Sequence, residues 1–213
     1  RKQTTHTPGT ALLCLENTHN RAGGTITPLA HMQELSRLAK EHGAAVHLDG
    51  ARIFNASVAA GVPAREYADC ADSVMFCFSK GLSCPVGSML VGPAELIARA
   101  HRWRKMFGGG MRQAGVLAAC GIVALETMID RLAEDHRRAR LLAEALTEVP
   151  GLTVDIEAVQ TNMVFAVTER PAAEVQQRMR ERGVLLLPVS ANRVRMVLHK
   201  DVDDEGLERA IGA

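Results

Sequence analysis

Short apolar runs and helical periodicities alternate along the first half of the chain. Apolar runs occur at 11–16, 44–48, 73–78 and 86–91, and at 28–42 apolar residues recur every three or four positions. The runs are typical of β-strands, and the periodic stretch is typical of an amphipathic α-helix. Because each run is almost continuously apolar, the pattern favours an α/β fold with a mostly parallel sheet covered on both faces.

The helix expected at 28–42 has recognisable ends. Thr27 is its expected N-cap, Pro28 its expected first residue, and Gly43 its expected stop. With the strands on either side, it predicts a β-α-β unit, and ligands of such folds bind at the carboxyl ends of the strands.

The middle of the chain is rich in helix-forming residues, at 93–107 and 111–147, with glycines at 108–110 between them. We expect the segment from 108 to 112 to open the second helix, so that its backbone N–H groups and the Arg112 side chain could hold an anion such as phosphate. A loop that follows the C-cap of the first helix explains the same glycines equally well.

A change of composition at Pro150 and Gly151 marks the expected domain boundary. Residues 1–149 are expected to form a large domain, and residues 150–213 a small α/β subdomain. Strand-like runs and helix-forming stretches alternate in this subdomain. The expected strands lie at 152–154, 163–167, 184–189 and 194–198, and the expected helices at 172–182 and 203–211.

The composition favours a globular protein that acts on a small molecule. The chain has 213 residues, of which 47% are hydrophobic and 23% charged, so it can bury a substantial core. With a net charge of +1, 3% aromatic residues and no run of Lys and Arg, it lacks the basic surface that binding to nucleic acids or membrane surfaces requires. We expect no metal site, because His19, His31, His42 and His47 lack the spacing of metal ligands.

Cysteine usage and the lack of targeting signals favour the cytoplasm. Five cysteines, an odd number, occur without a C-x-x-C pair, which indicates reduced thiols. No stretch approaches the roughly 20 apolar residues of a membrane-spanning helix, and no signal peptide is recognisable. The chain begins without Met and a strand-like run follows closely, so we expect that it opens partway through a longer protein.

Two ionisable residues stand at the carboxyl ends of expected strands. Asp49 follows the run at 44–48, and Lys80 follows the run at 73–78. An acidic side chain in this place could bind a cationic ring nitrogen, although a helix cap accounts for Asp49 equally well. A lysine beside a flexible glycine, here Gly81, suits the Schiff-base lysine of a pyridoxal phosphate (PLP) enzyme. Taken alone, the pair indicates a PLP site with only moderate specificity.

Four segments resemble threonine aldolases and occur in the order found in that family. They are Leu-Cys-Leu-Glu-Asn-Thr-His-Asn (13–20), His-Leu-Asp-Gly-Ala-Arg-Ile-Phe-Asn (47–55), Phe-Ser-Lys-Gly-Leu (78–82) and Gly-Gly-Gly-Met-Arg-Gln-Ala-Gly (108–115). The match continues through 161–163 and 195–199, so it covers nearly the whole chain. The resemblance implies the aspartate-aminotransferase-like fold of PLP enzymes (fold type I), with this chain as the carboxyl-terminal two thirds.

Residue by residue, the resemblance implies a PLP site in the large domain. Lys80 would carry the cofactor as a Schiff base, Asp49 would bind its pyridine nitrogen, and Arg52 would reach its phenolic oxygen. Lys105 and Arg112, with the glycines beside Arg112, would contribute to the active site of a neighbouring subunit. The resemblance therefore implies a homo-oligomer, a tetramer built from dimers that share their active sites.

The resemblance also implies that Arg195 binds the substrate carboxylate and that His6 lies near the substrate β-hydroxyl as a catalytic residue. For Arg195 the strand pattern agrees, because Val194, Met196 and Leu198 share one face and leave Arg195 on the other. An exposed strand arginine is the alternative. A guanidinium group suits a carboxylate, which it can bind through two parallel hydrogen bonds.

The implied activity is a retro-aldol cleavage of L-threonine or L-allo-threonine to glycine and acetaldehyde, which serves threonine catabolism and glycine biosynthesis. Relative to the family, the chain lacks an amino-terminal portion with the main phosphate-binding loop, so we expect the 213 residues alone to bind PLP poorly. Two alternatives remain open at this stage. One is another fold type I PLP lyase or aminotransferase, and the other is a truncated, non-catalytic module of the same fold.

Overall fold

The chain forms two compact units in the computed structural model, which describes residue 5 and residues 8–213. The first unit extends to Thr18 and resumes over Thr27–Ile129, and the second comprises His19–Ile26 and Asp130–Ala213. The division after Ile129 lies before the boundary expected between 149 and 150. The reason is helix α6 (Leu132–Thr147), which packs on strands β5 and β6 of the second unit.

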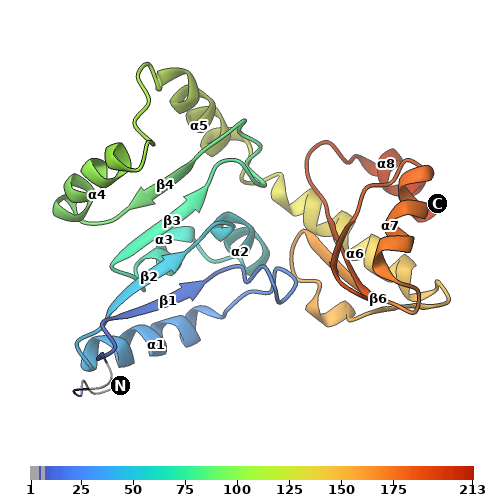
Figure 1. The fold of residues 1–213 in the computed structure, drawn as a ribbon, viewed down its shortest axis with the longest axis horizontal. Helices are drawn as coiled ribbons and strands as arrows, with labels where there is room; N and C mark the ends of the chain where they lie inside the picture. Colours follow the sequence, from blue (N-terminus) through green and yellow to red (C-terminus); the bar gives the residue numbers. More distant parts are fainter. Residues whose placement is uncertain (1–4, 6–7) are drawn as a thin grey trace. The chain divides into compact units, whose positions relative to one another are not determined.

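The first unit contains a four-stranded sheet in the order β1 (Leu12–Glu16), β2 (Ala45–Asp49), β3 (Ser73–Cys77) and β4 (Ser88–Val91) (Figure 1). Strands β1 to β3 are parallel, and β4 is antiparallel to β3. The expected mostly parallel sheet is thus confirmed. Because the three parallel strands run the same way, their carboxyl ends meet at one edge of the sheet.

The core of the first unit lies on one face of this sheet. Val46 and Leu48 are fully buried. Helix α1 (Leu29–Glu41) packs on β1 and β2 and contacts α3 (Ala64–Ala68), which packs against α2 (Ile53–Ala60). The alternate residues of β2 point to the opposite face, where Ala45 is exposed and Asp49 is partly exposed. The apolar runs predicted two covered faces, but no residue of β2 on this second face is fully buried.

Helix α1 begins one residue later than expected. Pro28 is its N-cap and Leu29 its first residue, and no side chain caps it. Thr27 is instead held by Asn17 at the end of β1: its N–H donates to Asn17 Oδ1 over 3.2 Å, and its C=O accepts from Asn17 Nδ2 over 3.1 Å. The prediction of Thr27 as the N-cap is therefore wrong: Pro28 takes that position, and the side chain of Asn17, the residue after β1, binds the backbone of Thr27.

The helix expected at 111–147 is two helices, α5 (Gly115–Thr127) and α6, and the break coincides with the passage between the two units. The segment from 108 to 112 does not open α5, which begins three residues after Arg112. Helix α4 (Ala94–Met106) ends at Phe107, and Gly108 follows with φ +81°. Only glycine adopts this conformation at low cost, so the structure bears out the alternative of a C-cap followed by a loop.

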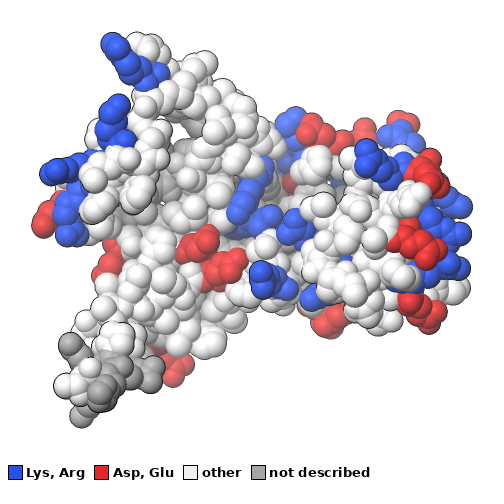
Figure 2. All heavy atoms as spheres, in the orientation of Figure 1, with Lys and Arg blue, Asp and Glu red and all other residues white. Residues whose placement is uncertain are grey.

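Large apolar side chains are exposed along β4, α4 and α5. All four residues of β4 are exposed, and no residue of α4 is buried. On the face shown in Figure 2, Lys and Arg side chains gather over α4, beside a broad uncharged surface. The exposed apolar residues of these elements include Met89, Leu90, Val91, Trp103, Met106, Val116, Ile122 and Val123. Within the described residues, no helix has both the length and the apolar character that crossing a membrane requires.

The second unit is built on an antiparallel sheet in the order β5 (Leu152–Val154), β6 (Met163–Thr168), β8 (Arg193–Val197) and β7 (Leu187–Ser190). A 3₁₀ turn at Ile156–Ala158 precedes β6, and helices α7 (Ala172–Glu181) and α8 (Asp204–Ile211) complete the unit. Its core joins residues of α6, α7 and α8 with one face of β6 and β8, including Val164, Ala166 and Val194. Besides the segment 150–213, this unit includes α6 and residues 19–26.

Residues 19–26 pack closely against the sheet of the second unit at Gly24. This glycine has φ +78°, and a Cβ atom there would lie 2.6 Å from Thr161 Oγ1 and 2.8 Å from Met163 Cε. We expect Gly24→Ala to lower the free energy of unfolding by roughly 2–3 kcal/mol, measured by urea denaturation. Gly43→Ala is the matched control, since Gly43 has φ +68° and nothing within 4 Å of the added atom. Equal losses in the two variants would contradict the close packing.

His136, on α6, should make the stability of the protein depend on pH. Burial lowers the pKa of His136 from 6.5 to about 4, and the nearby carboxylate of Asp135 only partly opposes this. Between these two values the unfolded chain binds a proton that the folded protein does not, so the free energy of unfolding falls as the pH falls, by roughly 2–3 kcal/mol in total. His136→Gln should remove this component in denaturation series between pH 7 and 4. If the free energy of unfolding changes with pH in the same way in the variant and the wild type, His136 does not make this contribution.

Candidate functional site

Asp49 ends β2 at the edge of the sheet where the parallel strands terminate. Its Oδ1 accepts a hydrogen bond from the N–H of Ala51 over 3.0 Å, and Gly50 N–H donates to Met75 O over 2.8 Å. Helix α2 begins only at Ile53, with no side-chain cap. The carboxylate therefore stabilises the turn after β2 and does not cap the helix. Its remaining lone pairs can accept further hydrogen bonds.

Lys80 lies in the connection between β3 and β4. Backbone hydrogen bonds make this connection compact: Ser83 N–H donates to Lys80 O over 2.8 Å, Cys84 N–H to Phe78 O over 3.0 Å, and Phe78 N–H to Gly87 O over 3.0 Å. The Lys80 side chain is exposed and forms no ion pair with a described residue. The backbone thus fixes where the lysine sits, while its amine stays available for chemistry.

The sheet topology brings Asp49 and Lys80 to the same edge. Strands β2 and β3 are parallel neighbours, with Asp49 paired to Met75, and Lys80 lies three residues after the end of β3. Adjacent strands of a sheet lie roughly 4.8 Å apart. The backbone thus brings a residue with a carboxylate and a residue with a primary amine to the edge where the parallel strands end, which is where α/β proteins bind ligands.

A buried hydroxyl at this edge was missed by the sequence analysis. Thr18 follows β1, the third strand that ends here. It is 3% exposed, and its Oγ1 has no hydrogen-bond partner within the part of the chain that the structure describes. Leaving a buried polar group unpaired costs about 1–3 kcal/mol, so such groups are rare unless a ligand satisfies them. The resemblance segment 13–20 contains Thr18, but no local pattern distinguishes its hydroxyl from an ordinary surface hydroxyl.

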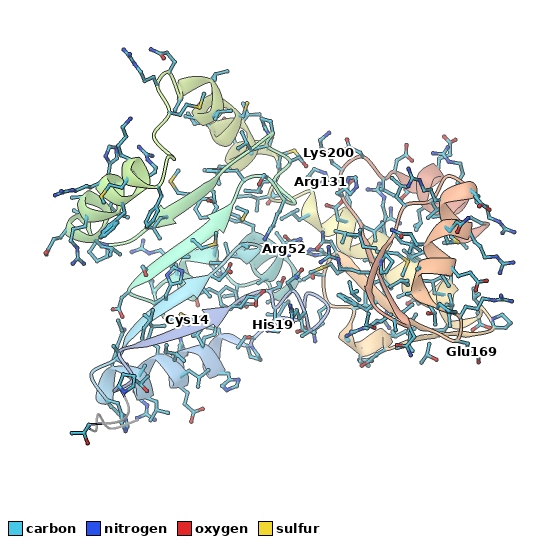
Figure 3. All side chains as sticks on the ribbon, in the orientation of Figure 1. Cys14, His19, Arg52, Arg131, Glu169 and Lys200 are labelled. Carbon is cyan, nitrogen blue, oxygen red and sulfur yellow. The ribbon has the colours of Figure 1, made fainter. Side chains whose placement is uncertain are left out.

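The other predicted cofactor residues differ in position. Arg52 lies in the turn between β2 and α2, three residues after Asp49 and partly buried (Figure 3). Lys105 lies near the end of α4, where its side chain packs at Gly110, and Arg112 is exposed in the following loop. No recorded contact among the described residues joins Lys105 or Arg112 to Asp49 or Lys80. His6 lies outside the described residues.

Arg195 belongs to β8 in the second unit. Its Nη1 donates a hydrogen bond to Asn20 Oδ1 over 3.2 Å, and its buried Nε has no hydrogen-bond partner in residue 5 or residues 8–213. As the strand pattern predicted, Val194 on the same strand is buried in the core, so Arg195 points to the other face. Asn20 is a second residue that the sequence analysis missed, because 175 positions separate it from its partner.

The model of the beta-eliminating lyase family matches residues 1–169, well over half of the chain. The chain belongs to the beta-eliminating lyase family. Among curated relatives of this lyase family member, a probable low-specificity L-threonine aldolase 2 of Arabidopsis thaliana is 45% identical over 207 residues, which are 95% of this chain and 58% of that protein. The low specificity L-threonine aldolase of Escherichia coli K12 is 47% identical over 95% of this chain and 59% of its own length. The resemblance to threonine aldolases is confirmed.

Solved structures of other proteins share the fold of this family member. A putative aromatic amino acid beta-eliminating lyase/threonine aldolase of Exiguobacterium has a TM-score of 0.81 and 25% identity, covering 100% of this chain and 66% of that one. A putative L-allo-threonine aldolase of Listeria monocytogenes has a TM-score of 0.78 at 23% identity, over 93% of this chain and 59% of that one, and so supports the fold alone. The chain spans less than 60% of the length of the curated relatives named above.

Proposed function

We propose that this chain is the larger part of a PLP-dependent aldehyde-lyase that cleaves L-threonine and L-allo-threonine to glycine and acetaldehyde. The observation that supports the proposal is the sheet topology: Asp49 ends β2, and Lys80 lies in the connection that follows the parallel neighbour β3 at the same edge. The names of the curated relatives, both L-threonine aldolases, supply the reaction.

The residues at this edge fit PLP by their chemistry. Lys80 supplies an amine that can bind the cofactor covalently, Asp49 a carboxylate for its ring nitrogen, and Arg52 a cation for its phenolic oxygen. The unpaired Oγ1 of Thr18 at the end of β1 provides a further buried polar atom for a ligand group. When bound, PLP supplies an electron sink for the electron pair that is released when the Cα–Cβ bond breaks.

Residues of the chain would bind the ring nitrogen, the substrate carboxylate and the β-hydroxyl. Ionised Asp49 would keep the proton on the ring nitrogen and so deepen the sink. Arg195 would bind the substrate carboxylate and fix the amino acid in place. His6 would lie near the β-hydroxyl, whose proton must leave as the carbonyl of acetaldehyde forms; a proton returned to Cα then gives glycine.

The proposed enzyme is a homotetramer whose subunits share their active sites. Lys105 and Arg112 would serve the active site of a neighbouring subunit in a homotetramer, and the exposed apolar residues of α4 and α5 support an interface on these helices. The cleavage would serve threonine catabolism and glycine biosynthesis in the cytoplasm.

The direct test is an assay of the protein expressed from its complete reading frame. With PLP, we expect stoichiometric glycine and acetaldehyde from L-threonine and L-allo-threonine, measured by coupled reduction of the aldehyde. β-Hydroxyaromatic amino acids serve as comparison substrates. Transfer of the amino group to a keto acid without aldehyde release would favour an aminotransferase instead. A protein that binds PLP but turns over none of these substrates would contradict the proposal.

A further inference from the structure

Residues 19–26 form a loop of the second unit, and hydrogen bonds join this loop to residues just before β6. Thr161 Oγ1 donates a hydrogen bond to Gly24 O over 2.7 Å, and Ile26 N–H donates to the side-chain oxygen of Gln160 over 2.8 Å. The loop also closes on itself, since His19 N–H donates to Thr25 O over 2.9 Å. Because Thr161 and Gln160, just before β6, bind the backbone of Gly24 and Ile26, the loop has little freedom to move relative to that strand.

The close fit of this loop against β6 fixes where Asn20 stands. Gly23 and Gly24 have φ of +99° and +78°, and both are buried. A Cβ at Gly23 would lie 3.6 Å from the ring of Phe165, which is paired with Arg195 in the register of β6 and β8. The loop therefore covers the face of the sheet that carries Arg195, opposite the face packed by the helices.

On that face, two arginines have different partners. The guanidinium of Arg193 stacks over the ring of Phe165, 4.3 Å from its centre. Among the described residues, Asn20 Oδ1 binds Arg195 at Nη1 over 3.2 Å, and none is a hydrogen-bond partner of the buried Nε. In a guanidinium group, Nε and the nitrogen Nη2 form one edge, which can bind a carboxylate through two hydrogen bonds. Asn20 thus holds the terminal nitrogen that this edge does not use.

We propose that Asn20 is a positioning residue, which orients Arg195 so that its Nε edge meets the carboxylate of the amino-acid substrate. The inference rests on the proposed function of Arg195. An arginine side chain loses much rotamer freedom when it binds, and a hydrogen bond that is already formed removes part of that loss. The loop 19–26 supplies the rigid support.

The chemistry of an amide explains why asparagine suits this position. Its oxygen accepts a hydrogen bond from the guanidinium without neutralising the positive charge. An aspartate in the same place would form an ion pair with Arg195 and compete with the substrate carboxylate. Asn20→Asp should therefore weaken substrate binding at least as much as Asn20→Ala, although it keeps an acceptor oxygen.

The test compares two probes that differ only at the carboxyl group. Glycine carries the carboxylate, and glycinamide replaces it with a neutral amide. The protein is expressed from its complete reading frame and loaded with PLP, and the dissociation constants of both probes are measured by titration of the cofactor absorbance. For Asn20→Ala we expect a roughly tenfold weaker affinity for glycine and a change of less than about twofold for glycinamide. KM for L-threonine should rise more than kcat falls.

A double-mutant cycle shows whether Asn20 acts through Arg195. In an Arg195→Ala background, Asn20→Ala should cause no further loss of glycine affinity. If Arg195→Ala weakens both probes equally, the carboxylate role proposed for Arg195 is wrong. If Arg195→Ala acts selectively on glycine while Asn20→Ala leaves glycine binding unchanged or weakens both probes alike, the positioning role of Asn20 is overturned and that of Arg195 stands.

Discussion

Replacing Lys80 with arginine is expected to lower kcat for threonine cleavage by at least roughly 10³-fold, the scale on which enzymes lose activity with a covalent catalytic group. Arginine keeps the positive charge, but its guanidinium does not deprotonate in proteins and so cannot replace an amine that must bond to the cofactor. The fold should persist, because Lys80 contributes to the β3–β4 connection through its backbone carbonyl, and its side chain is exposed.

The same variant should lose covalent cofactor. Borohydride reduction followed by peptide mass spectrometry should place the PLP mass on Lys80 in the wild type and nowhere in Lys80→Arg. Lys200→Arg is the matched control, because Lys200 is an exposed lysine that pairs with Asp201 at 2.6 Å (Figure 3). Wild-type turnover in Lys80→Arg, or reduction onto a different lysine, would remove the basis of the proposed function.

Asp49→Asn should reduce kcat by roughly 10²-fold, the scale of removing one preorganised electrostatic contact in an active site. The amide oxygen of asparagine can still accept the hydrogen bond from Ala51 N–H, so the turn after β2 should be kept while the charge is lost. Asp49→Ala also removes that hydrogen bond, and should lower the free energy of unfolding by about 1 kcal/mol as well as weaken cofactor retention.

The control for this pair of variants is Asp69→Asn. It removes a charge from an exposed carboxylate that lies 3.7 Å from Arg65, a surface pair of little energetic weight. Cofactor absorbance, kcat and denaturation midpoints of all three variants separate electrostatic loss from structural loss. A wild-type rate and spectrum in Asp49→Asn would mean that the carboxylate does not support the ring nitrogen.

The elements of the first sheet could be located from the sequence because their signals are local. The strand expected at 44–48 is observed one residue later, at Ala45–Asp49, and the stop of α1 at Gly43 is confirmed by its φ of +68°. Asp49 and Lys80 could be placed at strand ends for the same reason. Once two strands are parallel neighbours, the positions of their ends follow from the run lengths.

Other features depended on contacts between distant segments. Residues 111–147 favour a helix throughout, so local propensity does not show that the helix breaks where the chain passes between the units. For the glycines at 108–110, a helix start and a C-cap were equally compatible with the sequence, and Gly108 was settled only by its left-handed backbone.

The sequence by itself determined the strands, the family resemblance, and the amine and carboxylate proposed for catalysis, because periodicity, turn residues and motif order are properties of neighbouring positions. Only the tertiary structure decided which side chains meet across the fold. Packing between separate segments produces the hydrogen bond between Asn20 and Arg195 and the hydrogen bonds between Asn17 and Thr27. It also leaves the hydroxyl of Thr18 unpaired within the described part of the chain. Such contacts depend on the geometry of the whole unit, and no local pattern of residues records them.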